Sequence, residues 1–385
     1  MRIICAPDKF KGSLDAADAA RLMRMGIMDA APDAVVDLCP MADGGEGFAG
    51  TLAAAIGSAL TWRSPQDVTG PMGDRVAASF YCVDQAHGDQ SLAIVEMASA
   101  SGLALAPAES RDPTRATTTG TGELIRAAID AGRTRILIGI GGSATNDGGC
   151  GAAQAMGARF FDRAGKRIDQ PITGGMLHSI SRIDLAPLRA VLQGVAITAA
   201  CDVTNPLTGP RGAAHVYAPQ KGATPQQVAM LDDGLKHLAR ITREQLGLDH
   251  EHTPGAGAAG GMGFGLLAFF NATLRPGIEL VLEAVRFDER VKACDLCLTG
   301  EGRFDDQSLA GKVCAGVARA AKKHGVPTIA LVGAAGPEID QAVEQGLLVG
   351  YEFIGRGLSQ QESMARAGEL LRASAKKVCV ARWSR

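Results

Sequence analysis

Short apolar runs alternate with longer segments of helical periodicity at both ends of the chain. Near the start, residues 3–6 and 35–39 are predicted strands, and residues 14–28, with Ser13 as N-cap, and about 47–55 are predicted helices. Near the end, the pattern predicts strands at 295–299, 328–332 and 347–351 and helices at 313–324 and 361–381. Such alternation is typical of parallel strands joined by helices. We therefore expect the two chain ends to build one doubly wound, Rossmann-like α/β sheet.

The pattern changes in the middle of the chain. Residues 76–82 and 91–97 resemble antiparallel strands joined by a polar connection. Residues 224–246 are predicted to form a polar helix and residues 253–265 a glycine-rich loop, and the strand at 295–299 is expected to open onto a loop at 299–312. Residues 286–293 are interpreted as a link back to the first domain. We predict a discontinuous α/β domain of residues 1–70 and 286–385 and an inserted mixed α/β domain of residues 71–285, with the functional cleft between them.

A glycine-rich loop follows the predicted buried strand at residues 136–140 and precedes a predicted helix at 150–156. Glycines remove the Cβ atoms that would keep an anion away from backbone N–H groups, and a helix start directs its positive end toward the same loop. The pattern favours a bound oxyanion such as phosphate or carboxylate, and a tight turn without a ligand is the alternative. The candidate binding residues of this loop are Gly141, Gly142, Ser143, Thr145, Asn146 and Asp147.

Composition places the chain among ordinary globular proteins. Its 385 residues, 46% hydrophobic and 21% charged, are enough for two cores. A net charge of −2 without a Lys/Arg block argues against nucleic acid as a partner. The chain start lacks the features of a signal peptide, and no apolar run reaches the roughly 20 residues that span a bilayer. We therefore expect a cytoplasmic protein with no membrane partner, whose nine cysteines are reduced.

Several familiar motifs are absent or misplaced. The chain has no G-x-x-x-x-G-K-[ST], no H-R-D and no D-F-G. A G-x-G-x-x-G match at residues 255–260 follows a proline instead of a strand, which disfavours a dehydrogenase. His250 and His252 form a candidate metal pair, but the absence of a nearby third ligand favours a solvated turn.

Charged side chains gather at the predicted strand ends. Phosphoryl transfer needs backbone cradles for phosphates, cations against negative charge, carboxylates for Mg²⁺ and a base for the attacking hydroxyl. Taken singly, each charged residue is an ordinary surface residue, but as a set at the strand ends they favour a ligand site. Besides the glycine-rich loop, the candidates are Lys9, Lys11, Asp43, Glu46, Asp202, Asn205, Glu301, Arg303, Asp305 and Lys312.

Ten motifs along the chain resemble those of bacterial glycerate kinases of type 1, the glycerate 2-kinase family. They are PDKFKGSL (7–14), PMADGGEG (40–47), VTGPMG (68–73), EMASASGL (96–103), IGGSATNDGG (140–149), CDVTNPL (201–207), PQKGA (219–223), GAGAAGG (255–261), RPGIE (275–279) and TGEGRFD (299–305). The resemblance implies phosphorylation of D-glycerate with ATP and Mg²⁺. It also implies a flavodoxin-like domain from both termini and an inserted domain similar to restriction-endonuclease folds. The chain departs from the family at Lys9, where relatives often carry Ser, and at Thr119, where an aromatic residue is common.

The resemblance and the charge pattern together suggest roles. We expect Lys11 or Arg303 to hold the glycerate carboxylate, and the loop at 141–146 to meet the ATP phosphates. Asp202 is expected to orient or deprotonate the attacking hydroxyl and Asp305 to bind Mg²⁺, although these two roles are exchangeable. The alternatives left open are a 3-phosphoglycerate product, another small hydroxy acid such as tartronate as acceptor, and a non-catalytic phosphometabolite sensor. A homodimer is also left open.

Overall fold

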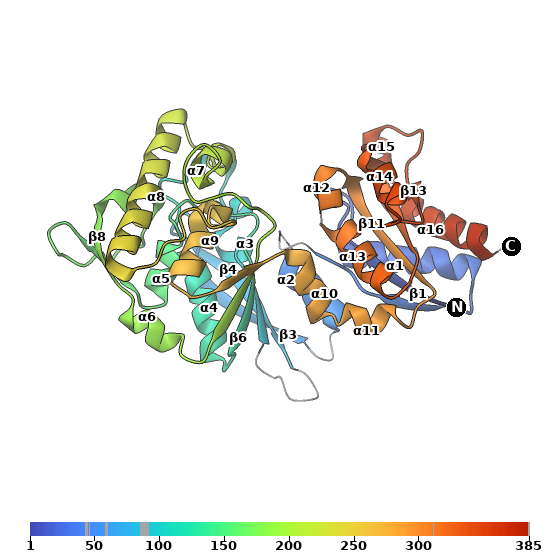
Figure 1. Cartoon of the computed structure of the whole chain (residues 1–385), viewed down its shortest axis with the longest axis horizontal. Helices are drawn as coiled ribbons and strands as arrows, with labels where there is room; N and C mark the ends of the chain where they lie inside the picture. The colour runs from blue at the N-terminus through green and yellow to red at the C-terminus, as the bar shows by residue number, and fades with distance from the viewer. Residues whose placement is uncertain (43–44, 46, 58–60, 85–91, 311, 384–385) are drawn as a thin grey trace. The chain divides into compact units, whose positions relative to one another are not determined.

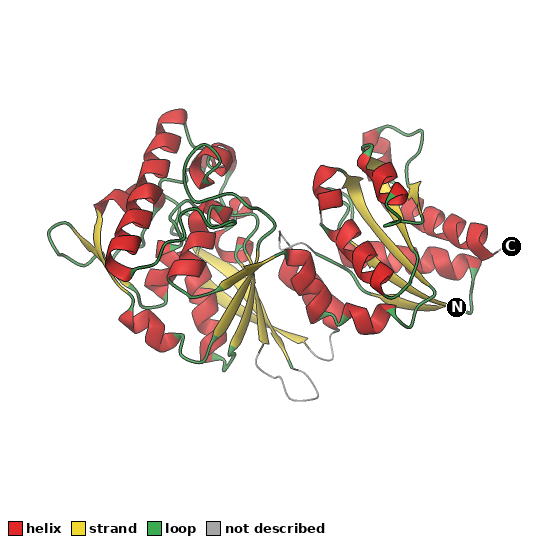
Figure 2. Ribbon diagram, in the orientation of Figure 1, coloured by secondary structure: helices red, strands yellow, loops and turns green. Residues whose placement is uncertain are grey.

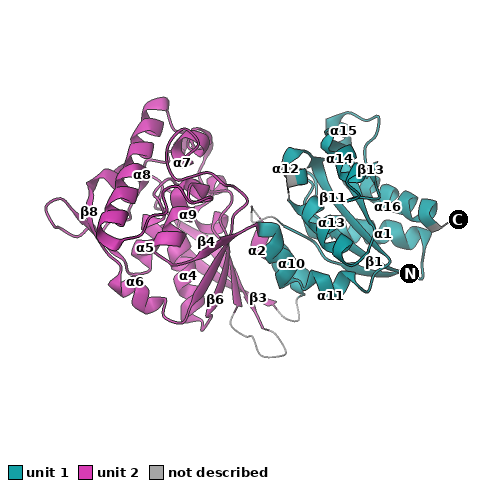
Figure 3. Cartoon of the chain, viewed as in Figure 1, with its two compact units in different colours: residues 1–43, 50–58, 277–385 teal, residues 44–49, 59–276 magenta. Residues whose placement is uncertain are grey.

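Two compact units make up the chain (Figure 3). The computed structural model describes residues 1–42, 45, 47–57, 61–84, 92–310 and 312–383 (Figure 1). Unit 1 comprises Met1–Asp43, Gly50–Ser58 and Gly277–Arg385, and unit 2 comprises Gly44–Ala49 and Ala59–Pro276. Within the described residues, no helix combines the length and the apolar character needed to cross a membrane.

Unit 1 is built on a parallel sheet of five strands. These are β1 (Arg2–Pro7), β2 (Val35–Leu38), β11 (Leu296–Phe304), β12 (Thr328–Ala335) and β13 (Gly350–Phe353). Their spatial order is β13-β12-β11-β1-β2, which becomes 2-1-3-4-5 when the strands are counted along the chain. This is the strand order of flavodoxin-like, doubly wound sheets. The two ends of the chain therefore meet where β1 pairs with β11.

Helices cover both faces of this sheet (Figure 2). They are α1 (Ala16–Ala30), α10 (Gly277–Ala284), α11 (Phe287–Val291), α12 (Asp306–Ala310), α13 (Val313–Lys323), α14 (Glu338–Glu344), α15 (Gln360–Ala365) and α16 (Ala367–Trp383), together with most of α2 (Phe48–Ile56). One core, containing Met23 and Leu371, lies between the sheet and the helices α1 and α16. A second core, containing Phe304 and Cys314, lies under α12, α13 and α14 on the opposite face. Because successive strand residues point to opposite faces, strands buried on both sides read as continuous apolar runs.

Unit 2 is built on a mixed sheet of six strands. These are β3 (Thr61–Thr69), β4 (Arg75–Val83), β5 (Leu92–Glu96), β6 (Arg135–Gly139), β9 (Ala196–Ala200) and β10 (Thr273–Arg275). The sheet runs β10-β9-β6-β5-β4-β3, with β3, β4 and β5 antiparallel and the others parallel. The antiparallel pairing of β4 with β5 confirms the prediction for residues 76–97. A separate hairpin joins β7 (Arg159–Asp162) to β8 (Ile180–Asp184).

The helices of unit 2 close one large core that contains Phe80, Ile138, Phe160 and Phe264. They are α3 (Ala98–Ser101), α4 (Thr119–Asp130), α5 (Cys150–Ala155), α6 (Ala186–Val191), α7 (Ala213–Tyr217), α8 (Pro225–Leu246) and α9 (Ala258–Ala268), with short 3₁₀ turns at Leu103–Leu105, Ala108–Ser110, Gly174–Ser179 and Pro219–Lys221. Local signals set the ends of α8, because Thr224 and Gln227 form a capping box and Gly247 ends the helix in a left-handed conformation. The strong mixed α/β character agrees with the predicted fold class.

The structure assigns two segments differently from the sequence prediction. Residues 61–69 form β3, which pairs along its whole length with β4, so they belong to the sheet of unit 2 and not to the N-terminal domain of residues 1–70. Residues 277–284 form α10, which packs against α11 and α13 in unit 1 and not in the inserted domain of residues 71–285. The chain therefore enters the main part of unit 2 at residues 58/59 and leaves it at 276/277, and residues 44–49 also belong to unit 2.

Three local predictions were wrong. The N-cap of α1 is Asp15, whose carboxylate accepts a hydrogen bond from the Asp18 N–H at 2.7 Å, while the Ser13 hydroxyl donates to the Phe10 carbonyl. The glycine-rich segment at 253–265 was expected to be a loop, but residues 262–265 are helical in α9, after a left-handed kink at residues 259–261. Strand β11 continues to Phe304, where the sequence predicted a loop from Thr299, because pairing with β12 extends to Ala335.

Candidate active site

The charged candidates of unit 1 lie at the point where the sheet order reverses. Strand β1 ends at Pro7, and the Asp8 N–H then donates a hydrogen bond to the Gly300 carbonyl of β11 at 2.8 Å. Strands β1 and β11 are first and third along the chain, so the gap between them is the topological switch point, where doubly wound sheets bind ligands. The following loop carries Lys9 and Lys11. The backbone nitrogen of Lys11 lies 3.2 Å from the position that a Cβ atom on Gly302 would occupy, so this loop packs on β11.

Glu301 is the buried acid of this cluster. Its side chain is 7% exposed, and no described residue hydrogen bonds to its Oε1 atom. Burial raises the pKa of Glu301 to about 7, with further raising from Asp8 and Asp305, against hydrogen bonds with Ser308 and Cys314 that lower it. A carboxyl group with a pKa near neutrality can exchange a proton at physiological pH. Glu301 is therefore chemically suited to proton transfer.

The remaining candidates of unit 1 sit at the same carboxyl edge of the sheet. Arg303 is exposed at the end of β11, and Asp305 is half-buried at the start of α12, where the Ser308 N–H donates to its Oδ1 at 3.4 Å. Lys312 occupies the N-cap position of α13. The structure therefore brings five candidates together at one sheet edge. They are Lys9, Lys11, Arg303, Asp305 and Glu301. Asp43 and Glu46 lie outside the described residues.

The glycine-rich loop of unit 2 follows β6, as predicted, but its polar side chains point inward. Ser143 is 7% exposed, and Thr145, Asn146 and Asp147 are completely buried. Gly141 and Gly142 form the part of the loop nearest to solvent. The sequence pattern favoured an oxyanion bound by this loop, and in the structure the polar side chains of the loop are packed into the unit.

The Asp147 carboxylate stabilises the loop through internal hydrogen bonds. It accepts hydrogen bonds from the Thr118 N–H and hydroxyl, both at 2.8 Å, and from the N–H groups of Gly149 and Gly151, both at 3.2 Å. Burial raises the pKa of Asp147, and these four donors counteract that shift. Because Thr118 precedes α4 and Gly149 precedes α5, the carboxylate ties together the starts of two helices. Its oxygens are thus engaged inside the protein.

Lys221 joins the loop, although the sequence analysis did not single it out. Its side chain is 2% exposed, and its Nζ donates to the Ser143 hydroxyl and the Thr145 carbonyl, both at 2.7 Å. Burial lowers the pKa of Lys221 to about 7, and the negative charge of Asp147 partly offsets this effect. The available signal was the PQKGA motif at 219–223, which contains a lysine between a proline and a glycine.

Asp202 and Asn205 follow β9, which pairs with β6, so they lie at the same sheet edge as the glycine-rich loop. Asp202 is exposed. The Asn205 side chain is occupied within the protein, because its Nδ2 donates to the Arg211 carbonyl at 2.7 Å and its Oδ1 accepts from the Tyr217 hydroxyl at 2.6 Å. Of the two predicted residues, Asp202 is thus the better placed to meet a ligand.

The ligand types that Mg²⁺ prefers are present, but no preformed metal cluster occurs in the described part of the chain. Among the residues with described positions, no group of three or more His, Cys, Asp and Glu side chains could hold a metal ion. The two carboxylates predicted to bind Mg²⁺ belong to different units, Asp202 to unit 2 and Asp305 to unit 1. Mg²⁺ in kinases commonly takes one or two carboxylates and completes its shell with waters and substrate phosphates.

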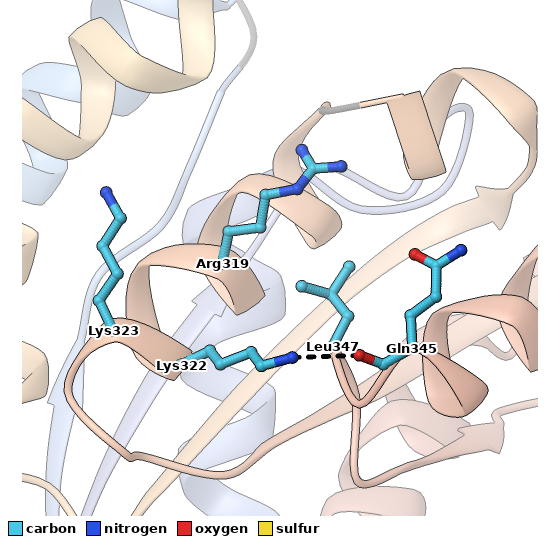
Figure 4. Close-up of a pocket in the computed structure, with 5 residues that line it drawn as sticks. All are labelled: Arg319, Lys322, Lys323, Gln345 and Leu347. Carbon is cyan, nitrogen blue, oxygen red and sulfur yellow. Dashed lines mark hydrogen bonds between the residues drawn. The ribbon is translucent and has the colours of Figure 1, made fainter.

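A cavity of about 360 Å³ lies elsewhere in unit 1 (Figure 4). Three cations of α13 line it, namely Arg319, Lys322 and Lys323, and Lys322 Nζ donates to the Gln345 carbonyl at 3.1 Å. These residues form the C-terminal end of α13, which lies toward the amino ends of the parallel strands. Ligands of doubly wound sheets bind at the opposite edge, so this cavity is a poor candidate for the active site.

Comparisons with known proteins agree on one family. The family model described as "Glycerate kinase family" matches residues 3–383. The glycerate kinase of Halalkalibacterium halodurans is 45% identical over 378 residues, which are 98% of this chain and 97% of that protein. The glycerate 2-kinase of Escherichia coli is 45% identical over 349 residues, or 90% and 89% of the two chains.

A solved structure extends this similarity to the fold. A crystal structure reported as that of a glycerate kinase 2 from Salmonella typhimurium LT2 has a TM-score of 0.87 and 41% sequence identity. The match covers 100% of this chain and 98% of that one. The mixed α/β fold is thus shared along the whole length. The chain belongs to the glycerate kinase family.

Proposed function

We propose that this enzyme transfers the γ-phosphoryl group of ATP to D-glycerate and forms 2-phosphoglycerate. Membership of the family supports glycerate as the acceptor, and the name of the Escherichia coli relative supports the 2-position. The observation that carries the proposal is the cluster of Lys9, Lys11, Arg303, Glu301 and Asp305 at the switch point of the unit 1 sheet. It combines cations for an anionic substrate with carboxylates that can hold a metal or a proton.

The exposed cations would bind the acceptor. Lys11 and Arg303 are exposed, so both can reach a carboxylate, and an arginine can hold it through two parallel hydrogen bonds. Lys9, Asp43, Glu46 and Lys312 stay candidates for substrate binding. In unit 2, the backbone at Gly141 and Gly142 is the part of the loop that is open to a phosphate group.

Two carboxylates compete for the role of base. Asp202 lies two residues after the end of β9, and it is our candidate for orienting or deprotonating the attacking hydroxyl. Glu301 is favoured by its pKa of about 7 and by its unpartnered Oε1 atom. Asp305 in unit 1 and Asp202 in unit 2 are each a candidate carboxylate for Mg²⁺, which when bound neutralises negative charge on the phosphates.

The direct test is turnover of the purified protein with D-glycerate and ATP, followed by phosphorus NMR of the product. The proposal expects 2-phosphoglycerate. A 3-phosphoglycerate signal would correct the position, and preferred turnover of tartronate would correct the acceptor. Tight binding of glycerate without turnover would replace the kinase by a sensor.

Substitution separates the two candidate bases. If Asp202 is the base, Asp202→Asn should lower kcat by about 100-fold or more at unchanged fold, while Glu301→Gln should have the smaller effect. The reverse order would assign the role to Glu301. Near-normal kcat in both folded variants would remove both residues from proton transfer.

A further inference from the structure

The amine of Lys221 is buried without a countercharge. Its two hydrogen-bond acceptors, the Ser143 hydroxyl and the Thr145 carbonyl, are both neutral. Among the residues that the structure describes, no carboxylate lies within ion-pair distance of Nζ. Asp147 acts on the amine only through its field, since its carboxylate accepts four other hydrogen bonds. An ammonium group has three donors, so one N–H of Lys221 is left for another partner.

Unpartnered polar atoms adjoin the carbonyl that Lys221 holds. The Thr145 hydroxyl and both polar atoms of the Asn146 side chain are completely buried, and no described residue bonds to them. Leaving one such group unsatisfied costs about 1–3 kcal/mol, so three such atoms on the residue that Lys221 contacts and on the next one require an explanation. A ligand oxygen that accepts from the amine and from the Asn146 amide would provide it.

The backbone holds this loop tightly. Gly260 has a φ of +70°, and a Cβ atom there would lie 1.9 Å from the Thr145 carbonyl oxygen. On another side, a Cβ atom on Gly174 would lie 2.9 Å from the Asn146 carbonyl oxygen. Only residues without a side chain can approach so closely, so the loop is fixed before any ligand arrives. Preorganised donors of this kind bind anions at little entropic cost.

We propose that Lys221, Thr145 and Asn146 form a binding site for an oxyanion group of a substrate. The chemistry fits a carboxylate or a phosphate oxygen, entering from the side of Gly142, which is the exposed part of the loop. The inference rests on the proposed function, because glycerate supplies the first group and ATP the second. The competing explanation is a purely structural lysine that only joins residues 143 and 145.

The ionisable groups around the amine determine its pH dependence. Asp147 lies in the same loop, and the Arg111 backbone packs against Gly222, with Asp112 next in the chain and engaged by Thr114. Anion binding needs the charged amine, so the affinity for the anion should fall as the pH rises above about 7. An arginine stays charged across this range, so Lys221→Arg should abolish that fall wherever the longer side chain still binds.

The test compares Lys221→Met with Lys166→Met, a control at an exposed lysine of the same unit. KM is measured for D-glycerate at saturating ATP and for ATP at saturating D-glycerate. We expect Lys221→Met to raise one of the two by about 100-fold, as expected for a lost charged hydrogen bond, and the control to raise neither. If the KM for glycerate rises, the site binds the glycerate carboxylate. If the KM for ATP rises, the site binds a phosphate group of ATP. Thr145→Val, which only replaces a hydroxyl by a methyl group, should raise the same KM by about 10-fold.

Two results would overturn the inference. One is a folded Lys221→Met protein with both KM values and the pH profile of the wild type, which would leave a structural lysine. The other result applies if Lys221→Met does not fold: it is a folded Thr145→Val protein whose KM values for D-glycerate and ATP equal those of the wild type. Calorimetric titration with D-glycerate, ATP and inorganic phosphate keeps this test separate from the proposed function. If the wild type binds an anion without turnover and Thr145→Val binds it more weakly, the site stands although the kinase proposal fails.

Discussion

At the scale of single residues, the raised pKa of Glu301 predicts how the stability of the folded protein changes with pH. Because its folded pKa, about 7, lies above that of an exposed glutamate, the folded state holds a proton that the unfolded state releases. This contribution to stability is complete below about pH 4 and is lost as the pH rises through about 7. Glu301→Gln should therefore stabilise the protein at pH 8, by up to about 3 kcal/mol, and change it little in acid.

The measurement is unfolding by urea at pH 5 and pH 8 for the wild type and Glu301→Gln. Glu344→Gln is the matched control, because Glu344 is an exposed glutamate of the same unit. An equal effect of Glu301→Gln at both pH values would contradict the assigned titration. So would a pH-dependent effect of similar size in the control.

The sequence located the charged residues of the site better than it judged their burial. Lys9, Lys11 and Arg303 could be placed at strand ends, because apolar runs mark where buried strands stop. Lys221 was missed, since its burial depends on partners 78 and 76 residues away in sequence. Asp147 was interpreted as a ligand residue, because nothing local reveals that its carboxylate caps two helices.

At the scale of elements, the reliable predictions were those with local signals. The ends of α8 could be predicted from Thr224 and Gly247, which act within one turn of the helix. Strand β3 could not, because its sequence contains Pro65 and six polar or charged residues, and only its pairing with β4 makes it a strand. An edge strand tolerates a proline, and β3 is at the edge of its sheet. The length of β11 was also underestimated from the sequence, because the last residues of this strand are held by pairing with β12.

The packing of α1 on α16 gives an element-scale prediction. Gly26 of α1 is buried, and a Cβ atom there would lie 2.1 Å from the Arg372 carbonyl oxygen of α16. Gly26→Ala should therefore force the helices apart and destabilise the protein by about 2 kcal/mol, although alanine favours helix. Thermal unfolding measures the effect.

Gly368→Ala is the control for this contact. Gly368 lies on α16, and its added Cβ atom would meet the flexible side chains of Leu22, at 3.3 Å, and Leu14, at 4.0 Å. Here the helix propensity of alanine should make the change neutral or stabilising by up to about 1 kcal/mol. The packing explanation fails if the two variants have the same melting temperature.

At the scale of the whole molecule, the chain ends depend on each other. Strand β1 lies between β2 and β11 in the sheet. On the β11 side, Ile3 pairs with Leu296, so a strand from the other end of the sequence covers this edge of β1. Without the last third of the chain, β1 and β2 would be a two-stranded remnant with an uncovered edge, which is not stable alone. Unit 2 has no such dependence, because its six-stranded sheet and its large core use residues 61–275.

The fragment of residues 59–276, the continuous part of unit 2, should therefore fold by itself, with a single cooperative thermal transition in circular dichroism. Phe160→Ala in this fragment should lower the transition markedly, because Phe160 is completely buried and packs edge-on against Phe269, and such a truncation costs about 3–5 kcal/mol. The fragment should show no turnover of glycerate, because it lacks the charged candidates of unit 1, namely Lys9, Lys11, Glu301, Arg303, Asp305 and Lys312. If it bound D-glycerate or ATP as the full chain does, the anion site of unit 2 would be sufficient for that ligand. A fragment without a cooperative transition would show instead that unit 2 needs unit 1 to fold.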